Sequence, residues 1–178
     1  MDPLVDTDWL EAQLGAGDLV VLDATWYMPG DPRDANGAFA NAHIPGARRF
    51  DIDQISDHDT SLPHMVPSAE QFAQQARRLG ISNDCRVVCY DQLGIFSAAR
   101  AWWMLRLFGH DAVAVLDGGL PKWRAEHRPV QEGVPQAPPP GRFRSALRAG
   151  LLRGLGDIRD NLDTKREVIL DARSADRL

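Results

Sequence analysis

Residues 86–108 read RVVCYDQLGIFSAARAWWMLRLF and combine a short apolar run, a turn and a helical pattern. The run at 86–90 is rich in β-branched residues, as expected of a strand that is buried on both faces. Over 97–108, apolar side chains recur at helical spacing, and Gly109 follows. A buried strand that leads through a turn into a helix is the repeating unit of α/β folds with parallel sheets.

The same alternation continues on both sides of this stretch. Further strands are expected at 19–24, 49–52 and 112–116, and helices at 9–14, 68–79 and 120–126. The helix at 68–79 opens with Ser68 and Gln71 at capping-box spacing and ends before Gly80. The sequence therefore predicts an α/β domain whose mostly parallel sheet is covered by helices on both faces.

Composition and charge narrow the class of protein. With 178 residues, of which 44% are hydrophobic and 25% are charged, the chain has enough apolar side chains for one core. It lacks the run of roughly 18 apolar residues that a membrane helix needs and lacks a secretory leader, so we expect a cytoplasmic protein without membrane contact. The net charge of −5 argues against nucleic acid as a partner, and we interpret the four arginines within 142–153 as part of a solvated linker.

The two cysteines, Cys85 and Cys89, are too few for a disulfide framework, and their spacing does not suit a zinc site. A phosphatase nucleophile needs an arginine six positions after the cysteine, but Asp91 and Ile95 stand at those positions. We therefore expect both thiols to be small core groups, and we expect no metal or other cofactor.

The turn at 91–97 begins where a parallel strand ends, at the edge of the sheet where backbone N–H groups and helix N-termini gather and ligands bind. Its first residue, Asp91, can cap the following helix but is a poor carrier of sulfur. The side chains of Leu93, Ile95 and Phe96 predict an apolar loop, in which a thiol at position 91 would have a raised pKa.

The composition changes after residue 127. Residues 128–141 are rich in proline and have little periodicity, so we expect a first domain over 1–127 and then a semi-extended linker. On this interpretation, cutting the chain near Gln131 leaves the first domain unchanged.

A second feature of this region is a repeat. The stretch EVILDA at 167–172 resembles LVVLDA at 19–24, which indicates that residues 142–178 open a second copy of the domain, unless the match is accidental. So short a copy cannot build a core of its own. We therefore expect it either to self-associate through its apolar strand or to be loosely held.

Polar residues in three places are candidate site residues. HIPGA at 43–47 forms a compact turn before a strand. Asp53 and His64 follow, His64 on a loop where plain exposure to solvent is an equally good interpretation. Arg173 and Arg177 lie one helical turn apart and could clamp a carboxylate-like or sulfonate-like anion, or could be a solvated pair.

These pieces together resemble the tandem rhodanese-type sulfurtransferases of the 3-mercaptopyruvate and thiosulfate branch. The matching motifs are LDATWY at 22–27, HIPGA at 43–47, FDID at 50–53, HMVP at 64–67, YD at 90–91, FSAARAWWM at 96–104, FGH at 108–110 and LDGGL at 116–120. The match spans nearly the whole chain, and the WWM helix followed by the DGG turn makes it specific.

The resemblance implies a rhodanese-like fold and transfer of sulfur from 3-mercaptopyruvate, or from thiosulfate, to a thiol or cyanide through a cysteine persulfide. In that family the first domain is catalytically silent, and Asp91 falls where the second domain keeps its cysteine. The DAR motif at 171–173 is similar to one that opens the second domain. We therefore expect the nucleophile in a missing C-terminal segment, and we expect the 178-residue chain to be inactive by itself.

Roles for individual residues follow from the same resemblance. Asp53 resembles a carboxylate that completes a Cys-Ser-Asp relay, and His64 resembles a cleft histidine of the 3-mercaptopyruvate branch. Arg173 and Arg177 resemble arginines that hold the substrate anion. The partners implied are a small-molecule sulfur donor and a thiol acceptor such as thioredoxin.

A non-catalytic binding or regulatory module with a rhodanese-like fold is the alternative. The repeat distinguishes the two hypotheses, since a dedicated binding module has no need for the DAR motif after its linker. A longer reading frame with a second HIPG motif and a cysteine loop would decide for the enzyme.

Overall fold

The computed structural model describes residues 1–172, which fall in two compact units, Met1–Leu147 and Arg148 onward. The first unit is built on a five-stranded sheet of order β1-β5-β4-β2-β3, in which every paired strand is parallel. Its strands are β1 (Leu4–Val5), β2 (Leu19–Asp23), β3 (Arg48–Arg49), β4 (Arg86–Tyr90) and β5 (Val113–Leu116). Its helices are α1 (Thr7–Gln13), α2 (Ala35–Asn41), α3 (Ala69–Arg78), α4 (Ala98–Leu107) and α5 (Gly119–Ala125).

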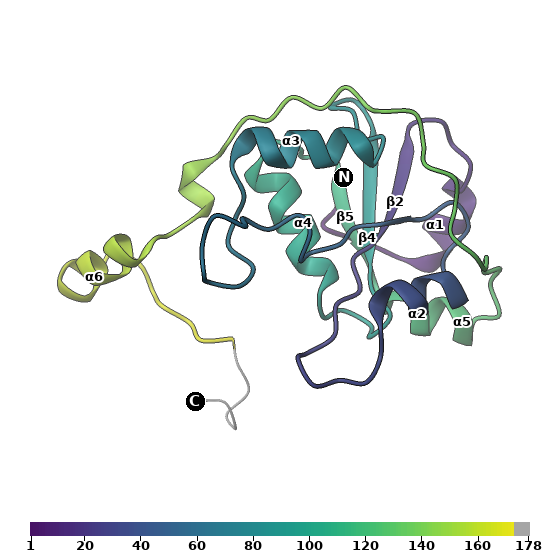
Figure 1. Ribbon diagram of the computed structural model, residues 1–178, viewed down its shortest axis with the longest axis horizontal. Coiled ribbons are helices and arrows are strands. Elements are labelled where there is room, and N and C mark those ends of the chain that lie inside the picture. Colours follow the sequence, from purple (N-terminus) through teal and green to yellow (C-terminus); the bar gives the residue numbers. More distant parts are fainter. Residues whose placement is uncertain (173–178) are drawn as a thin grey trace. The chain divides into compact units, whose positions relative to one another are not determined.

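The central strands bury side chains on both faces of the sheet. Val87 and Cys89 belong to one core cluster, together with apolar residues of α3 and α4. Val88 and Tyr90 belong to a second cluster, which contains apolar residues of α1, α2 and α5. Figure 1 shows the two helical layers on either side of the strands. This arrangement confirms the predicted α/β class, and it explains why the central strands are apolar without alternation.

Most predicted elements occur where the pattern placed them. The capping box at the start of α3 is formed: Ser68 Oγ accepts the backbone N–H of Gln71, whose side chain accepts the N–H of Ser68. The strand expected at 49–52 is instead the short β3. The pattern missed β1, which is too short for a periodicity, and α2, whose small and polar residues give little apolar signal.

The proline-rich segment after α5 packs onto the first unit. Phe143 is buried in the core beside Phe72, with an edge-on ring contact at 5.8 Å. The N–H of Gly141 donates to the carbonyl of Arg77 at 2.8 Å, and the N–H of Ala146 donates to that of Phe108 at 2.9 Å. The compact unit therefore extends to Leu147 rather than ending at residue 127, because an extended chain can still bury an aromatic anchor and pair its backbone.

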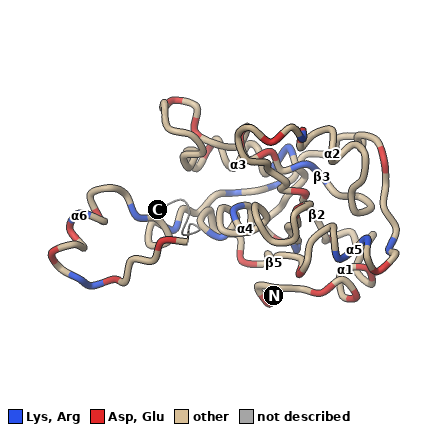
Figure 2. Tube along the Cα trace, turned by 90° about the horizontal axis from the view of Figure 1, so that it is seen from below, with Lys and Arg blue, Asp and Glu red and all other residues tan. Residues whose placement is uncertain are grey.

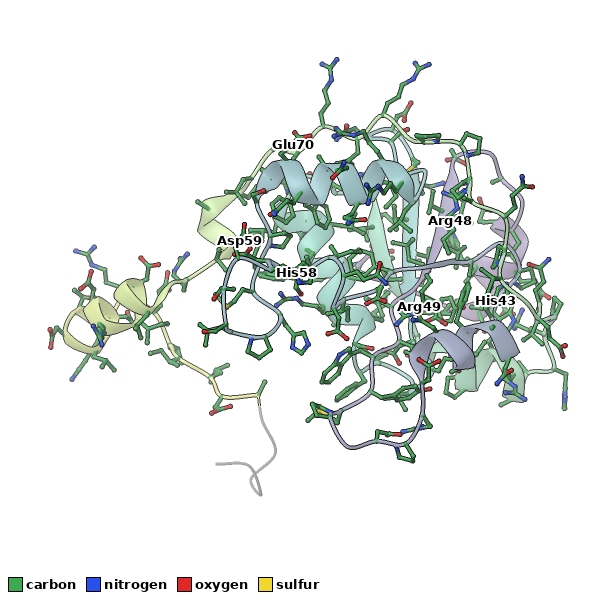
Figure 3. The ribbon with its side chains drawn as sticks, viewed as in Figure 1. His43, Arg48, Arg49, His58, Asp59 and Glu70 are labelled. Atoms are coloured by element: carbon green, nitrogen blue, oxygen red, sulfur yellow. The ribbon has the colours of Figure 1, made fainter. Side chains whose placement is uncertain are left out.

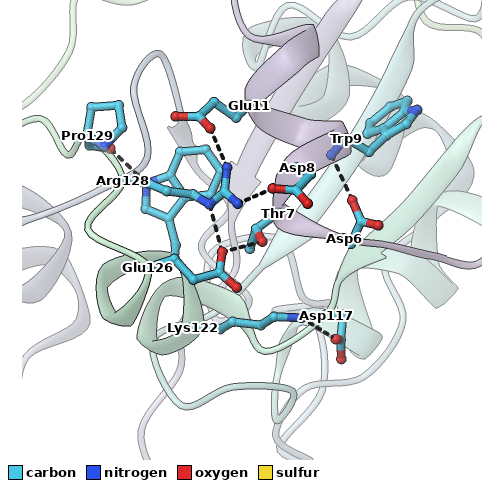
Figure 4. Close-up of polar contacts among 11 residues, drawn as sticks. Asp6, Thr7, Asp8, Trp9, Glu11, Asp117, Lys122, Glu126, Arg128 and Pro129 are labelled. Carbon is cyan, nitrogen blue, oxygen red and sulfur yellow. Dashed lines mark hydrogen bonds and ion pairs between the residues drawn. The ribbon is translucent and has the colours of Figure 1, made fainter.

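An ion-pair cluster fixes the start of this segment (Figure 4). The guanidinium of Arg128 donates to Glu126 at 2.7 Å and also to Asp8 and Glu11 on α1. The hydroxyl of Thr7 donates to the same Glu126 carboxylate. The cluster joins the first helix of the chain to the end of α5.

The second unit contains the 3₁₀ turn Ala149–Leu151 and the helix α6 (Leu155–Thr164). Val168 and Leu170 are 87% and 85% exposed, and residues 165–172 form neither helix nor strand. The strand expected at 167–172 is thus absent from this part of the chain. The second-copy hypothesis and self-association through this stretch stay predictions.

Charges of both signs are interspersed along the described chain (Figure 2). Over residues 1–172, none of the helices is long and apolar enough to cross a bilayer.

Candidate functional site

Two of the predicted site residues meet at the carboxyl edge of the sheet. Nε2 of His64 lies 2.7 Å from Oδ1 of Asp53, although the two residues are on a long irregular loop between β3 and α3. The His64 side chain is about one-third exposed and that of Asp53 is nearly two-thirds exposed. A histidine paired with a carboxylate at a solvent-accessible edge can hold and move a proton.

Trp26, which lies in the LDATWY motif but was not predicted as a site residue, contacts both members of this pair. The indole Nε1–H of Trp26 donates to the same Asp53 Oδ1 at 3.2 Å. The indole ring also meets the His64 ring edge-on, with centroids 5.0 Å apart. Two signals in the sequence pointed to Trp26: it lies in the LDATWY motif, and it follows the end of β2, where loops of a parallel sheet converge.

Beside the pair lies a hollow of about 240 Å³. Its lining residues are Trp26, Ile52, His64, Phe96, Ser97 and Arg100. Arg100 lies on α4, and its Nη2 donates to the backbone carbonyl of His64 at 2.6 Å. Burial lowers the pKa of this guanidinium. Its charge inside the apolar helical pattern of 97–108, which Arg106 shares, was the only signal for it in the sequence.

The loop after β4 encloses the carboxylate of Asp91, which is fully buried. Oδ2 accepts three backbone N–H groups, from Phe96 at 2.7 Å and from Ser97 and Ala98 at 2.8 Å each. Oδ1 accepts the N–H of Leu93 at 2.9 Å. The expected helix cap is therefore present, and the loop forms a four-donor anion cradle that its own aspartate fills.

The prediction that this loop is apolar inside was wrong. Leu93, Ile95 and Phe96 are 39%, 48% and 51% exposed, so these side chains face outward while the backbone N–H groups face inward. Residue polarity alone does not reveal this, because the direction of the amides depends on the backbone path.

Neither thiol is suited to carrying sulfur. Cys89 is fully buried in β4, and burial raises its pKa strongly. Cys85 is buried too, and burial raises its pKa while its Sγ–H contacts the carbonyl of Ser82 at 3.1 Å. A nucleophilic cysteine needs an accessible site that stabilises the thiolate, so these two are core groups, as the sequence predicted.

The HIPGA turn at 43–47 makes contacts with α2 and β4 that stabilise the fold. The ring of His43 stacks on Phe39, and its Nδ1 lies 2.9 Å from the carbonyl of that residue. The N–H of Ile44 donates to the hydroxyl of Tyr90 at 3.1 Å. Figure 3 shows His43 near α2, separated from His58 and Asp59 on the loop that also carries His64.

The structure does not place all the predicted residues. Arg173 and Arg177 lie outside the described residues. Within residues 1–172, no group of three or more His, Cys, Asp and Glu side chains is arranged to hold a metal ion.

Comparisons with known proteins identify the family of this chain. The sequence model of the rhodanese-like domain family matches residues 6–126. The chain is 43% identical to Thiosulfate/3-mercaptopyruvate sulfurtransferase 2 of Arabidopsis thaliana, over 97% of this chain and 56% of the plant protein. It is also 43% identical to the 3-mercaptopyruvate sulfurtransferase of Homo sapiens, over 98% of this chain and 60% of the human protein.

A bovine thiosulfate sulfurtransferase is similar to nearly the same degree, at 42% identity over 98% of this chain. The chain therefore spans less than two thirds of the length of these relatives. Among solved structures, SseA from Escherichia coli, described as having the rhodanese fold and as a 3-mercaptopyruvate sulfotransferase, superimposes with a TM-score of 0.93. Its identity to this chain is 37%, and the match covers 99% of this chain and 68% of that structure. Because the family model covers most of the first unit and these relatives match almost the entire chain, the protein belongs to the rhodanese-like family, and its relatives include 3-mercaptopyruvate and thiosulfate sulfurtransferases.

Proposed function

We propose that this chain supplies one half of a sulfurtransferase that moves sulfur from 3-mercaptopyruvate, or from thiosulfate, to a thiol or cyanide acceptor. The observation that carries the proposal is the His64–Asp53 pair, held at the carboxyl edge of the sheet in a chain whose relatives are named for these reactions. A thiol protein such as thioredoxin is the acceptor class we favour.

The persulfide cysteine of this enzyme lies outside residues 1–178 in our proposal. Asp91 fills the loop in which a sulfur-bearing thiolate would be stabilised, and Cys85 and Cys89 are both buried with raised pKa values. By itself, the 178-residue chain is therefore inactive.

The His64–Asp53 pair would act on the donor. When a thiolate attacks the sulfur of 3-mercaptopyruvate, the electron pair of the C–S bond passes to carbon, and the resulting pyruvate enolate takes up a proton. His64 can supply that proton from Nδ1, while Asp53 holds the ring in place through Nε2, which lies 2.7 Å from its Oδ1. Thiosulfate releases sulfite without such a proton step, so the pair favours 3-mercaptopyruvate as the donor. Arg173 and Arg177 remain the predicted ligands of the donor's carboxylate.

The test is turnover of the gene product that includes any sequence after Leu178, measured as sulfide released from 3-mercaptopyruvate in the presence of dithiothreitol. Asp53→Asn and His64→Asn should each lower kcat/KM by about 100-fold, the usual range for loss of a general acid or its partner. His58→Asn is the matched control, because His58 is an exposed histidine of the same loop and should leave turnover unchanged.

Two outcomes would contradict this proposal. One is undiminished turnover in both the Asp53 and the His64 variants. The other is robust turnover by residues 1–178 alone that Cys85→Ser or Cys89→Ser abolishes, because a thiol of this chain would then carry the sulfur.

A binding module is the second candidate, and the exposed apolar side chains of Leu93, Ile95 and Phe96 favour it. A gene product that shows no turnover with either donor, and that has no cysteine loop after Leu178, would support this alternative.

A further inference from the structure

His64 has a backbone conformation that needs support. Its φ angle is +56°, in the left-handed region that non-glycine residues rarely adopt. Such residues persist where the surroundings hold them in place. In this loop, the hydrogen bond from Arg100 Nη2 to the carbonyl of His64, at 2.6 Å, provides such a hold.

The guanidinium of Arg100 is incompletely paired, although it is partly buried in α4. Its guanidinium lies over the ring of Trp103, with Cζ 4.9 Å from the centroid. Its Nε is buried and has no hydrogen-bond partner among the described residues. A cation held this way contributes poorly to stability, since burial of an incompletely paired group is costly. Its bond to the His64 carbonyl therefore suggests a role at the site.

A second tether reaches the pair from the same part of α4. The hydroxyl of Ser97 accepts the backbone N–H of Trp26 at 3.1 Å. The indole of Trp26 in turn donates to Asp53 and contacts the ring of His64. Ser97 thus acts on the carboxylate through the tryptophan.

Both tethers start from an element that Asp91 fixes. The carboxylate of Asp91 accepts the N–H groups of Ser97 and Ala98, at the N-terminus of α4. Arg100 follows within the first turn of this helix. A single rigid element therefore holds the backbone of His64 and, through Trp26, the side chain of Asp53.

We propose that residues 97–100, held in place by Asp91, form a positioning platform for the His64–Asp53 pair. In this view, the Asp91 loop serves the site without carrying sulfur: Arg100 and Ser97 are positioning residues that orient the histidine and the carboxylate. The inference deepens the proposed function and rests on it for the role of the pair in sulfur transfer.

The experiment compares ¹⁵N NMR spectra of the 178-residue chain and its variants, reading the Trp26 indole N–H and the His64 imidazole nitrogens. Arg100→Gln removes the charge-assisted hydrogen bond to the His64 carbonyl, so it should shift both sets of signals. By loosening the pair to which the Trp26 indole bonds, it should also speed hydrogen exchange at that indole by about tenfold. Arg100→Lys should restore part of the wild-type pattern, because it keeps the charge. Ser97→Ala, a small change, should shift mainly the Trp26 signal.

The matched control is Arg106→Gln. Arg106 lies on the same helix and over Trp102, with Cζ 5.0 Å from the ring centroid, but it does not line the hollow beside His64. It should leave the Trp26 and His64 signals unchanged. Thermal unfolding of each variant identifies any that fails to fold, and in that case Ser97→Ala and Arg100→Lys carry the test.

The proposal is overturned if Arg100→Gln and Ser97→Ala leave both signals at their wild-type positions. It is also overturned if Arg106→Gln moves them as much as Arg100→Gln does, because the effect would then be a general loss of helix stability. Neither spectrum depends on turnover, so failure of the sulfurtransferase proposal would be seen separately, in the Asp53 and His64 variants.

Discussion

Oδ2 of Asp91 lies 2.8 Å from the backbone nitrogen of Ala98 and accepts its N–H, so a carboxylate occupies the N-terminus of α4. Together with three further N–H groups of the loop, this contact makes the site after β4 favourable for a negative charge. In a sheet of this kind, that position is where an external anion would otherwise bind.

The first prediction concerns this cradle. In Asp91→Cys, the introduced thiol should have a pKa clearly below the usual value of about 8.5, because the same N–H groups would stabilise the thiolate. Thiolate absorbance followed against pH measures it, and Cys85 and Cys89 do not interfere because burial raises their pKa values. Leu93→Cys, on the outer side of the same loop, is the control and should titrate normally. A raised pKa in Asp91→Cys would restore the apolar interpretation of the loop.

Gly119 should be intolerant of a side chain. Its φ is +54°, and a Cβ there would come within 2.5 Å of the carbonyl oxygen of Asp91 and 2.6 Å of that of Gly94. We expect Gly119→Ala to lower the free energy of unfolding by about 1–3 kcal/mol, as is usual for strained positions, and to disturb the loop. Chemical denaturation measures the loss, with Gly17→Ala, at an exposed site with open space, as the control. Equal stability of the two variants would show that the loop can move away.

Phe143 should anchor the segment after α5. Phe143→Ala removes a fully buried ring, so we expect a loss of about 3–5 kcal/mol in the free energy of unfolding. Val134→Ala, in the same segment but 81% exposed, should have no effect. Ending the chain near Gln131 should also destabilise the first unit, in contrast to the expectation from the sequence. A truncated chain with an unchanged melting transition would instead place the domain boundary in the proline-rich stretch.

The cluster around Arg128 should give the protein a defined acid sensitivity. Hydrogen bonds from Thr7 and Arg128 lower the pKa of Glu126, so its carboxylate binds protons less readily in the folded than in the unfolded chain. The resulting stabilisation is complete above the unfolded pKa of about 4.3 and is lost as pH falls through the lower folded value. Arg128→Gln should therefore lower the midpoint of thermal unfolding at pH 7, with the difference from wild type shrinking towards pH 3. Arg124→Gln, an exposed arginine of α5, should show no such difference. A pH-independent effect of Arg128→Gln would point to lost packing rather than charge.

The sequence by itself determined the class of fold and most of its elements. Apolar strands such as 86–90 and the Ser68 capping box are local signals, because backbone sterics and short-range hydrogen bonds set them. The motifs also identified Asp53, His64 and Asp91 as positions of interest, and they pointed to the sulfurtransferases.

Only the tertiary structure decided how these residues act together. The contact between His64 and Asp53 depends on an irregular loop. The hydrogen bond from Trp26 to Asp53 joins residues 27 positions apart in the sequence, and the one from Arg100 to His64 joins residues 36 positions apart. The direction of the amides around Asp91 and the burial of Phe143 likewise follow from the path of the backbone in space. The pattern of polar and apolar residues in the sequence indicates which side chains can be buried. The pattern does not indicate which hydrogen-bond donors and acceptors pair, because those pairs form only when distant segments pack together.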